Sequence, residues 1–276
     1  MPSVLVIAHR GARSVAPENT LAAARRAAEL GADGWEFDVQ MTKDGELVLM
    51  HDEALARTTD AGTVFPGRSP WRVADFTLHE IQKLDAGSWF VAQDPFGTIA
   101  SGEVPPEKAA EFHGERVPTL REALLLTKEL DLWANIELKG TPLSPLSNRS
   151  KDTVDKTVAL IRELGLTERV LVSSFDREMI RYLKRIAPEI AGALLVISMP
   201  SDPVAYLREV GADALNPKAS AFDRDAARGL GMAGFGVYVW TVNEPADLSR
   251  FAREPDVTGI ITDWPQRLRG ILDAGR

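Results

Sequence analysis

The stretch Gly34-Trp35-Glu36-Phe37-Asp38-Val39 alternates clearly between apolar and acidic residues. A period of two is that of a β-strand, so the two acids face one side of it and the three large apolar residues face the other. The apolar side suits a cover of packed helices. We therefore expect a buried strand whose two carboxylates point to the axis of a barrel.

The same strand pattern recurs along the whole chain. Short apolar runs alternate with longer amphipathic stretches, which is typical of βα units around a parallel sheet. Eight units in 276 residues predict an α/β fold, a (β/α)8 TIM barrel, as a single domain over residues 1–276. The predicted strands are 4–8, 34–39, 132–138, 170–173, 192–196, 212–215, 236–240 and 259–262. The predicted helices are 20–30, 120–130, 153–164, 176–186, 203–210, 224–230, 245–253 and 265–272. Asp176 and Asp263 are candidates for helix N-caps.

One unit is much longer than the others. About 80 residues separate the second strand from its helix, whereas a βα loop usually takes two to six. We expect an inserted subdomain at 46–118 over the C-terminal mouth of the barrel, without a second core. It begins with an alternating run at 46–51, contains a helical segment near 78–84, and continues through a region rich in Pro and Gly at 85–118.

Composition excludes several classes of function. The net charge is −8 and no basic stripe is present, so nucleic acid is not an expected partner. The chain has no cysteine, which excludes disulfides, zinc-thiolate sites and thiol nucleophiles. No apolar run approaches the ~18 residues of a membrane span, and residues 1–9 do not resemble a signal peptide. We expect a cytoplasmic protein without membrane insertion, and the sequence does not predict its oligomeric state.

Acidic residues end two neighbouring predicted strands. Glu137 alternates with apolar residues as Glu36 and Asp38 do, and adjacent strands lie about 4.8 Å apart. Three carboxylates in one small volume predict a divalent cation with oxygen ligands, Mg²⁺ or Ca²⁺. The alternative is that these acids form buried salt bridges with Arg10 and Lys139. With a divalent cation, the three acids and two bases leave one net positive charge, which suits a phosphodiester.

Two histidines and two aromatic residues also end strands. His9 and His51 lie beside the acids, and imidazole is suited to transferring protons near neutral pH. We interpret them as an acid and base pair, with a structural hydrogen-bonding role as the alternative. Phe175 and Trp240 either wall a substrate pocket or pack in the core.

Ten segments together resemble the glycerophosphodiester phosphodiesterase family of phospholipase C-like TIM barrels. The match runs the length of the chain, and the order and spacing of the segments make it specific. The segments are His9-Arg10-Gly11, Pro17-Glu18-Asn19-Thr20, Glu36-Phe37-Asp38-Val39, Thr42-Lys43-Asp44-Gly45, His51-Asp52, Arg57-Thr58-Thr59, Glu137-Leu138-Lys139, Ser173-Ser174-Phe175, Trp240-Thr241-Val242-Asn243 and Ile261-Thr262-Asp263.

The resemblance implies metal-dependent hydrolysis of a glycerophosphodiester to glycerol 3-phosphate and an alcohol. In related enzymes the glycerol hydroxyl next to the phosphate attacks first and gives a cyclic intermediate. The resemblance also assigns roles to seven residues: metal ligands Glu36, Asp38 and Glu137; acid and base His9 and His51; phosphate contacts Arg10 and Lys139.

Three other functions are compatible with parts of this pattern. One is a lysophospholipase D or sphingomyelinase D-like enzyme acting on lipid diesters. Another is a non-catalytic barrel that binds a phosphorylated polyol. A third is an aldolase or isomerase with Lys139 as Schiff-base nucleophile, although the carboxylate two residues before it favours phosphate pairing.

Two features leave their roles open. Glu18 and Asn19 precede the first helix, where they either cap it or favour a bound anion. The chain departs from the family pattern by extra residues around 95–110, which form either a lid or a solvated loop.

Overall fold

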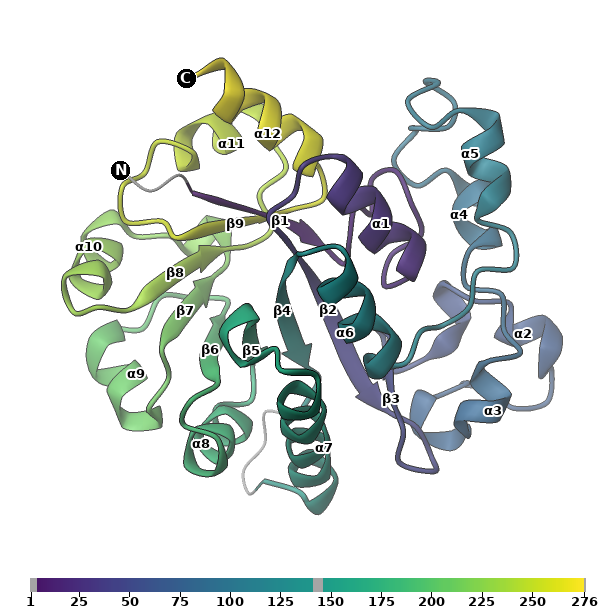
Figure 1. Ribbon diagram of the computed structural model, residues 1–276, viewed down its shortest axis with the longest axis horizontal. Coiled ribbons are helices and arrows are strands. Elements are labelled where there is room, and N and C mark those ends of the chain that lie inside the picture. Colours follow the sequence, from purple (N-terminus) through teal and green to yellow (C-terminus); the bar gives the residue numbers. More distant parts are fainter. Residues whose placement is uncertain (1–3, 141–145, 276) are drawn as a thin grey trace.

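Eight parallel strands form a ring that closes where β1 pairs with β2 (Figure 1). The computed structural model describes residues 4–140 and 146–275. The order of the sheet is β1-β9-β8-β7-β6-β5-β4-β2-β3, and β3 is antiparallel to β2. The predicted TIM barrel is confirmed. The strands are β1 Leu5–His9, β2 Gly34–Met41, β3 Leu47–Leu49, β4 Trp133–Leu138, β5 Val170–Ser174, β6 Ala191–Val196, β7 Ala214–Pro217, β8 Gly236–Val239 and β9 Gly259–Thr262.

Helices surround the ring and connect its strands. Those of the barrel are α1 Leu21–Glu29, α6 Leu120–Glu129, α7 Asn148–Leu164, α8 Arg177–Ile186, α9 Pro203–Val210, α10 Arg224–Met232, α11 Pro245–Phe251 and α12 Pro265–Ala274. They match the eight predicted helices. The largest shift is in α7, which begins five residues earlier than predicted because Ser147 caps it by accepting from Ser150 N. Asp176 caps α8 as predicted, whereas the N-cap position of α12 is Trp264 and not Asp263.

The alternation along β2 sorts its side chains as predicted. Trp35 and Phe37 are fully buried, with ring centroids 4.3 Å apart. The Trp35 indole donates a hydrogen bond of 2.9 Å to Thr127 on α6, which places this face against the outer helices. Glu36 and Asp38 consequently face the inside of the ring.

Apolar side chains fill the end of the barrel where the strands begin. Trp133 and Tyr238 stack at 5.5 Å between centroids and pack against a small cluster of Leu171, Ala193 and Ala214. This end of the barrel is filled by apolar side chains. The polar groups of the site therefore lie at the other end, where the strands terminate.

The insertion has a hydrophobic cluster of its own, which corrects our expectation of no second core. Ten buried residues between Val48 and Val117 form this cluster, separate from the main core. The insertion contains β3, α2 Ala61–Val64, α3 Leu78–Ile81, α4 Ser88–Gln93 and α5 Pro106–Glu111, with short 3-10 turns at Leu55–Arg57 and Val73–Asp75. Figure 1 shows α2 to α5 grouped on one side of the barrel, in blue and teal. That the segment 46–118 covers the mouth of the barrel stays a prediction.

The additional residues around 95–110 pack against the barrel. The Phe96 ring meets Trp264 edge-on at 5.8 Å, and the Thr98 hydroxyl donates a hydrogen bond of 2.7 Å to the Ser14 carbonyl. Val104 is buried. The segment is therefore anchored to the barrel at these points, while residues 100–103 between them are exposed, and the choice between a lid and a solvated loop stays a prediction. In the described part of the chain, no helix combines the length and apolar character needed to cross a membrane.

Candidate active site

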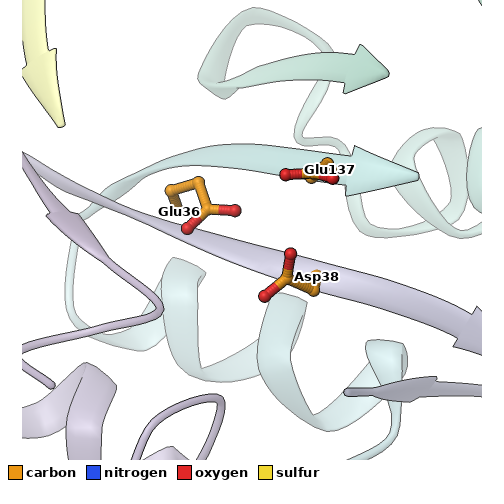
Figure 2. A group of neighbouring side chains, drawn as sticks. All are labelled: Glu36, Asp38 and Glu137. Carbon is orange, nitrogen blue, oxygen red and sulfur yellow. The ribbon is translucent and has the colours of Figure 1, made fainter. Parts of the chain in front are cut away.

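Three carboxylates converge where β2 and β4 end. The strand register pairs Asp38 with Glu137, two residues beyond the pair of Glu36 with Asn135. One oxygen from each of the three acids lies within 4.8 Å of the others. Figure 2 shows Glu36 and Asp38 on β2 and Glu137 on β4, with their carboxylates turned toward one shared space. The predicted cluster of acids is present.

Two basic side chains partly neutralise this cluster. Lys139 Nζ lies 2.6 Å from Asp38 and also pairs with Glu137. Arg10 Nε lies 3.4 Å from Asp38, and its backbone N–H donates a hydrogen bond of 2.9 Å to Glu36. The salt bridges that we considered as an alternative therefore exist. They leave one negative charge uncompensated, and Glu36 Oε1 is buried without a hydrogen-bond partner among the described residues.

The pKa values of the acids reflect this imbalance. Burial, with the charges of Asp38 and Glu137, raises the pKa of Glu36 well above its usual value. Burial and the Asp38 charge raise the pKa of Glu137 to about 7, against the opposing effect of Lys139. Although burial opposes its ionisation, Lys139 and Arg10 hold the pKa of Asp38 below its usual range. A cation bound at this point would relieve the two raised values.

Asn19 holds Asp38 in place from the loop after β1. Its amide donates a hydrogen bond of 2.8 Å to Asp38 Oδ2, and its carbonyl oxygen accepts from Asp38 N at 3.1 Å. Asn19 has a positive φ of 57°, a conformation that few residues other than glycine adopt. The residue thus orients a candidate metal ligand and does not cap α1, whose N-cap is Thr20.

His9, at the end of β1, is oriented by an aspartate that directly follows the last strand. Its Nδ1 lies 2.6 Å from Asp263 Oδ1, and its Nε2 lies 3.9 Å from Glu36. Burial lowers the pKa of His9 even though Asp263 favours the charged form. Because the Asp263 carboxylate accepts from Nδ1–H, the Nε2 nitrogen is the one that faces Glu36.

His51 has a similar partner in the insertion. Its Nδ1 lies 2.6 Å from Asp52, and Asp52 is held in turn by Arg57. Burial lowers the pKa of His51, while the charge of Asp38 opposes this shift. Each histidine thus forms a pair with an aspartate that fixes which ring nitrogen is free.

The two aromatic residues lie together beside a small cavity. Phe175 and Trp240 meet edge-on with centroids 5.5 Å apart. Trp240 and Ile261 line this cavity. The Trp240 indole donates a hydrogen bond of 2.7 Å to the Asn216 carbonyl. The lining also includes His9, Glu36, Asn135, Glu137 and Leu195. Phe175 is 38% exposed and adds an apolar edge.

The sequence reasoning overlooked the carboxylates that orient the histidines. Asp263 was assigned to a helix cap, although it directly follows the last strand. In a closed barrel that strand pairs with β1, with Ala8 beside Thr262, so the next residue falls next to His9. Asp52 directly follows His51, and this adjacency was the available signal.

Comparison with known proteins gives a consistent result at the level of family. The model of the glycerophosphoryl diester phosphodiesterase family matches residues 9–267. A glycerophosphodiester phosphodiesterase of Caldanaerobacter subterraneus subsp. tengcongensis is 39% identical over 272 residues, which cover 98% of each chain. One from Bacillus subtilis is 33% identical over 95% of this chain and 84% of its own.

Solved structures have the same fold. A phosphodiesterase of Oleispira antarctica, in complex with the product sn-glycerol-3-phosphate, superposes with a TM-score of 0.81 at 28% identity, covering 98% of this chain and 97% of its own. A glycerophosphodiester phosphodiesterase of Agrobacterium tumefaciens has a TM-score of 0.74 at 29% identity, with 97% and 99% covered.

Proposed function

Because the chain belongs to the glycerophosphoryl diester phosphodiesterase family, it is a phosphoric diester hydrolase, and we propose that it cleaves glycerophosphodiesters with a divalent cation and two histidines. The observation that carries the proposal is the cluster of three carboxylates between two histidine–aspartate pairs. The products are glycerol 3-phosphate and an alcohol.

The acidic cluster fits a divalent cation. Glu36, Asp38 and Glu137 supply hard oxygen ligands, and the orphaned Glu36 oxygen is a buried acceptor that a cation would satisfy. The cation, Mg²⁺ or Ca²⁺, would neutralise charge on the phosphate and favour ionisation of an attacking hydroxyl. With the cation, the cluster and its two bases carry one net positive charge, opposite to that of a phosphodiester.

The histidines are suited to moving the protons. One of His9 and His51, with Nε2 unprotonated, accepts the proton of the attacking oxygen. The other, protonated on both ring nitrogens, delivers its Nε2 proton to the leaving alcohol as the P–O bond breaks. Asp263 and Asp52 hold the Nδ1 protons, so each Nε2 is available. The attacking oxygen belongs either to water or to the neighbouring glycerol hydroxyl, which would give a cyclic phosphate before hydrolysis.

Arg10 and Lys139 bind the phosphate, and the aromatic pair borders the pocket. Both bases lie within hydrogen-bonding or ion-pair reach of the acids, where a bound phosphate would also meet them. Phe175 and Trp240 offer an apolar wall beside His9 for the carbon atoms of the substrate.

The rival enzyme class fits the site less well. A Schiff-base lysine must lose its proton near neutral pH, which requires a lowered pKa. Although burial opposes the charge, Asp38 and Glu137 raise the pKa of Lys139. The residue therefore stays protonated, as phosphate binding requires.

The test is release of glycerol 3-phosphate from glycerophosphocholine and glycerophosphoethanolamine, each with Mg²⁺, with Ca²⁺ and with EDTA. We expect release with a cation that EDTA suppresses and that His9→Ala and Glu137→Gln abolish. A lysolipid substrate and a screen for cyclic phosphate are run beside it. Activity on the lysolipid alone would contradict the proposal and favour a lysophospholipase D.

A further inference from the structure

We propose that Glu18 is a positioning residue that holds His9 and His51 in place relative to each other, a role that rests on the proposed function of these histidines. Glu18 lies in the loop between β1 and α1, and its side chain is 2% exposed. It contacts neither the acidic cluster nor a histidine directly, so it acts through other residues.

Three arginines surround the Glu18 carboxylate. Oε1 accepts from Arg10 at 2.8 Å and from Arg57 at 2.7 Å. Oε2 accepts from Arg57 at 3.2 Å and lies 3.0 Å from Arg13. Despite burial, these guanidinium groups lower the pKa of Glu18 to about 2, so the carboxylate is charged near neutral pH. Its negative charge is what holds the three cations together.

One branch of this network leads to His51. Arg57 donates to Glu18 with two nitrogens and also binds Asp52, which accepts from His51 Nδ1. Arg57 belongs to the insertion, whereas Glu18 belongs to the barrel. The contact therefore connects the segment that carries His51 to the barrel.

A second branch leads to His9. Arg13 contacts Glu18 with one nitrogen, and its other terminal nitrogen lies 3.7 Å from Asp263. Asp263 accepts from His9 Nδ1 at 2.6 Å. A third branch runs through Arg10 to Asp38. One arginine thus separates this buried carboxylate from each histidine's orienting aspartate, and one arginine separates it from the candidate metal ligand Asp38.

Removing the charge would release all three branches together. Without it, Arg10, Arg13 and Arg57 repel one another in a poorly solvated volume, and Asp52 and Asp263 lose their fixed partners. A displacement of about 1 Å in a proton-transfer group can cost on the order of 10²-fold in rate. Helix capping does not explain Glu18, because Thr20 performs that role for α1.

The first experiment measures the imidazole rings without any need for activity. The metal-free protein and its Glu18→Gln variant are compared by NMR at one pH, using the carbon-bound Cε1–H ring signals of the four histidines. We expect the His9 and His51 signals to move and those of His79 and His113 to stay. Unchanged His9 and His51 signals overturn the proposal, and so does an equal change in all four, which would indicate a general loss of structure.

The second experiment measures kinetics with a matched control. Glu254 is also a buried carboxylate bound by an arginine, Arg224, and it lies outside the site. We expect Glu18→Gln to lower kcat about 10- to 100-fold with little change in KM. Glu254→Gln should leave both unchanged, and Glu18→Asp, which keeps the charge, should restore part of kcat. An unchanged kcat in a folded Glu18→Gln protein overturns the proposal.

A double-mutant cycle identifies the route. If Glu18 acts through Arg57 and Asp52, adding Glu18→Gln to Asp52→Asn lowers kcat by less than about 3-fold further. Losses that multiply overturn that route.

Should the wild-type chain hydrolyse no glycerophosphodiester, the proposed function fails, while the NMR comparison still decides whether Glu18 holds both rings. If Glu18→Gln does not fold, Glu18→Asp is measured in both experiments.

Discussion

Glu137 occupies a position where its ionisation opposes folding of the metal-free protein. Its pKa is raised from 4.5 to about 7, mainly by burial and the charge of Asp38. Between these two values the folded chain keeps a proton that the unfolded chain releases, so the free energy of unfolding falls as the pH rises through this range. Above pH 7 the loss is complete, unless a cation compensates for the charge.

We therefore expect Glu137→Gln to stabilise the metal-free protein at pH 8. The predicted gain in the free energy of unfolding is about 1 to 3 kcal/mol, shrinking toward zero at pH 4.5, where the wild-type carboxyl is protonated. Urea unfolding in EDTA at both pH values measures it. Glu254→Gln, which breaks the ion pair of the buried Glu254 with the exposed Arg224, should destabilise at pH 8. A Glu137→Gln protein less stable than wild type at pH 8 would show that ionisation of Glu137 does not destabilise the metal-free protein.

Asp263 fixes the tautomer and orientation of His9, so its charge should matter for catalysis. We expect Asp263→Asn to lower kcat by about 10² to 10⁴-fold, as loss of an orienting carboxylate does in other enzymes, with a smaller effect on KM. Steady-state kinetics on glycerophosphocholine measures this. Asp33→Asn is the control, because Asp33 binds Val6 N and Arg269 at the opposite end of the barrel. A kcat within about 3-fold of wild type would remove Asp263 from the mechanism.

At the scale of elements, β2 requires a glycine at its first position. A Cβ on Gly34 would lie 2.4 Å from the carbonyl oxygen of Trp133 on β4. The two strands would have to separate at this point to admit the added atom. We expect Gly34→Ala to lower the free energy of unfolding by about 1 to 3 kcal/mol.

Urea unfolding measures this change against Gly229→Ala as a control. Gly229 lies in α10 with no atom within 4 Å of an added Cβ, and alanine there should stabilise the helix by up to ~1 kcal/mol. Equal effects of the two substitutions would mean that the close contact between β2 and β4 does not limit stability.

The elements of the barrel could be predicted because their signals are local. Period-two alternation marks β2 and β4, and amphipathic stretches mark the long helices. α2, α4 and α5 have only four to six residues, too few for a clear period, and they were not predicted. Packing within the insertion determines where these short helices form. The separate cluster around Phe76 was missed for the same reason, because its members are spread over short segments.

The functional site could be predicted only in part, again because some residues have a local signal in the sequence and others do not. The candidate ligands and histidines could be found because each ends a strand, and barrel topology brings strand ends together. Their partners depend on contacts between distant segments. His9 and Asp263 are 254 positions apart, and Glu18 and Arg57 meet only because the insertion folds against the β1–α1 loop. No short pattern in the chain encodes these pairings.

For the whole molecule, the acidic cluster couples cation binding to folding. Glu36, Asp38 and Glu137 converge only when β2 and β4 are paired, so the unfolded chain has no equivalent site. A ligand that binds only the folded state stabilises it in proportion to the logarithm of its free concentration. With a net charge of −8, the chain also gains from any cation through screening, and this general effect must be separated from binding.

Thermal unfolding with increasing Ca²⁺ or Mg²⁺ separates the two effects. At a free concentration 100 times its Kd, a specific cation adds about 2.7 kcal/mol, which corresponds to a rise in Tm of roughly 5 to 10 °C for a chain of this size. NaCl at equal ionic strength should produce a much smaller rise. Glu137→Gln should keep the response to NaCl and lose most of the response to the divalent cation, because it removes one of three ligands and retains the fold. If the rise in Tm with the divalent cation persists in this variant, or if NaCl reproduces it, the cation acts elsewhere on the acidic surface.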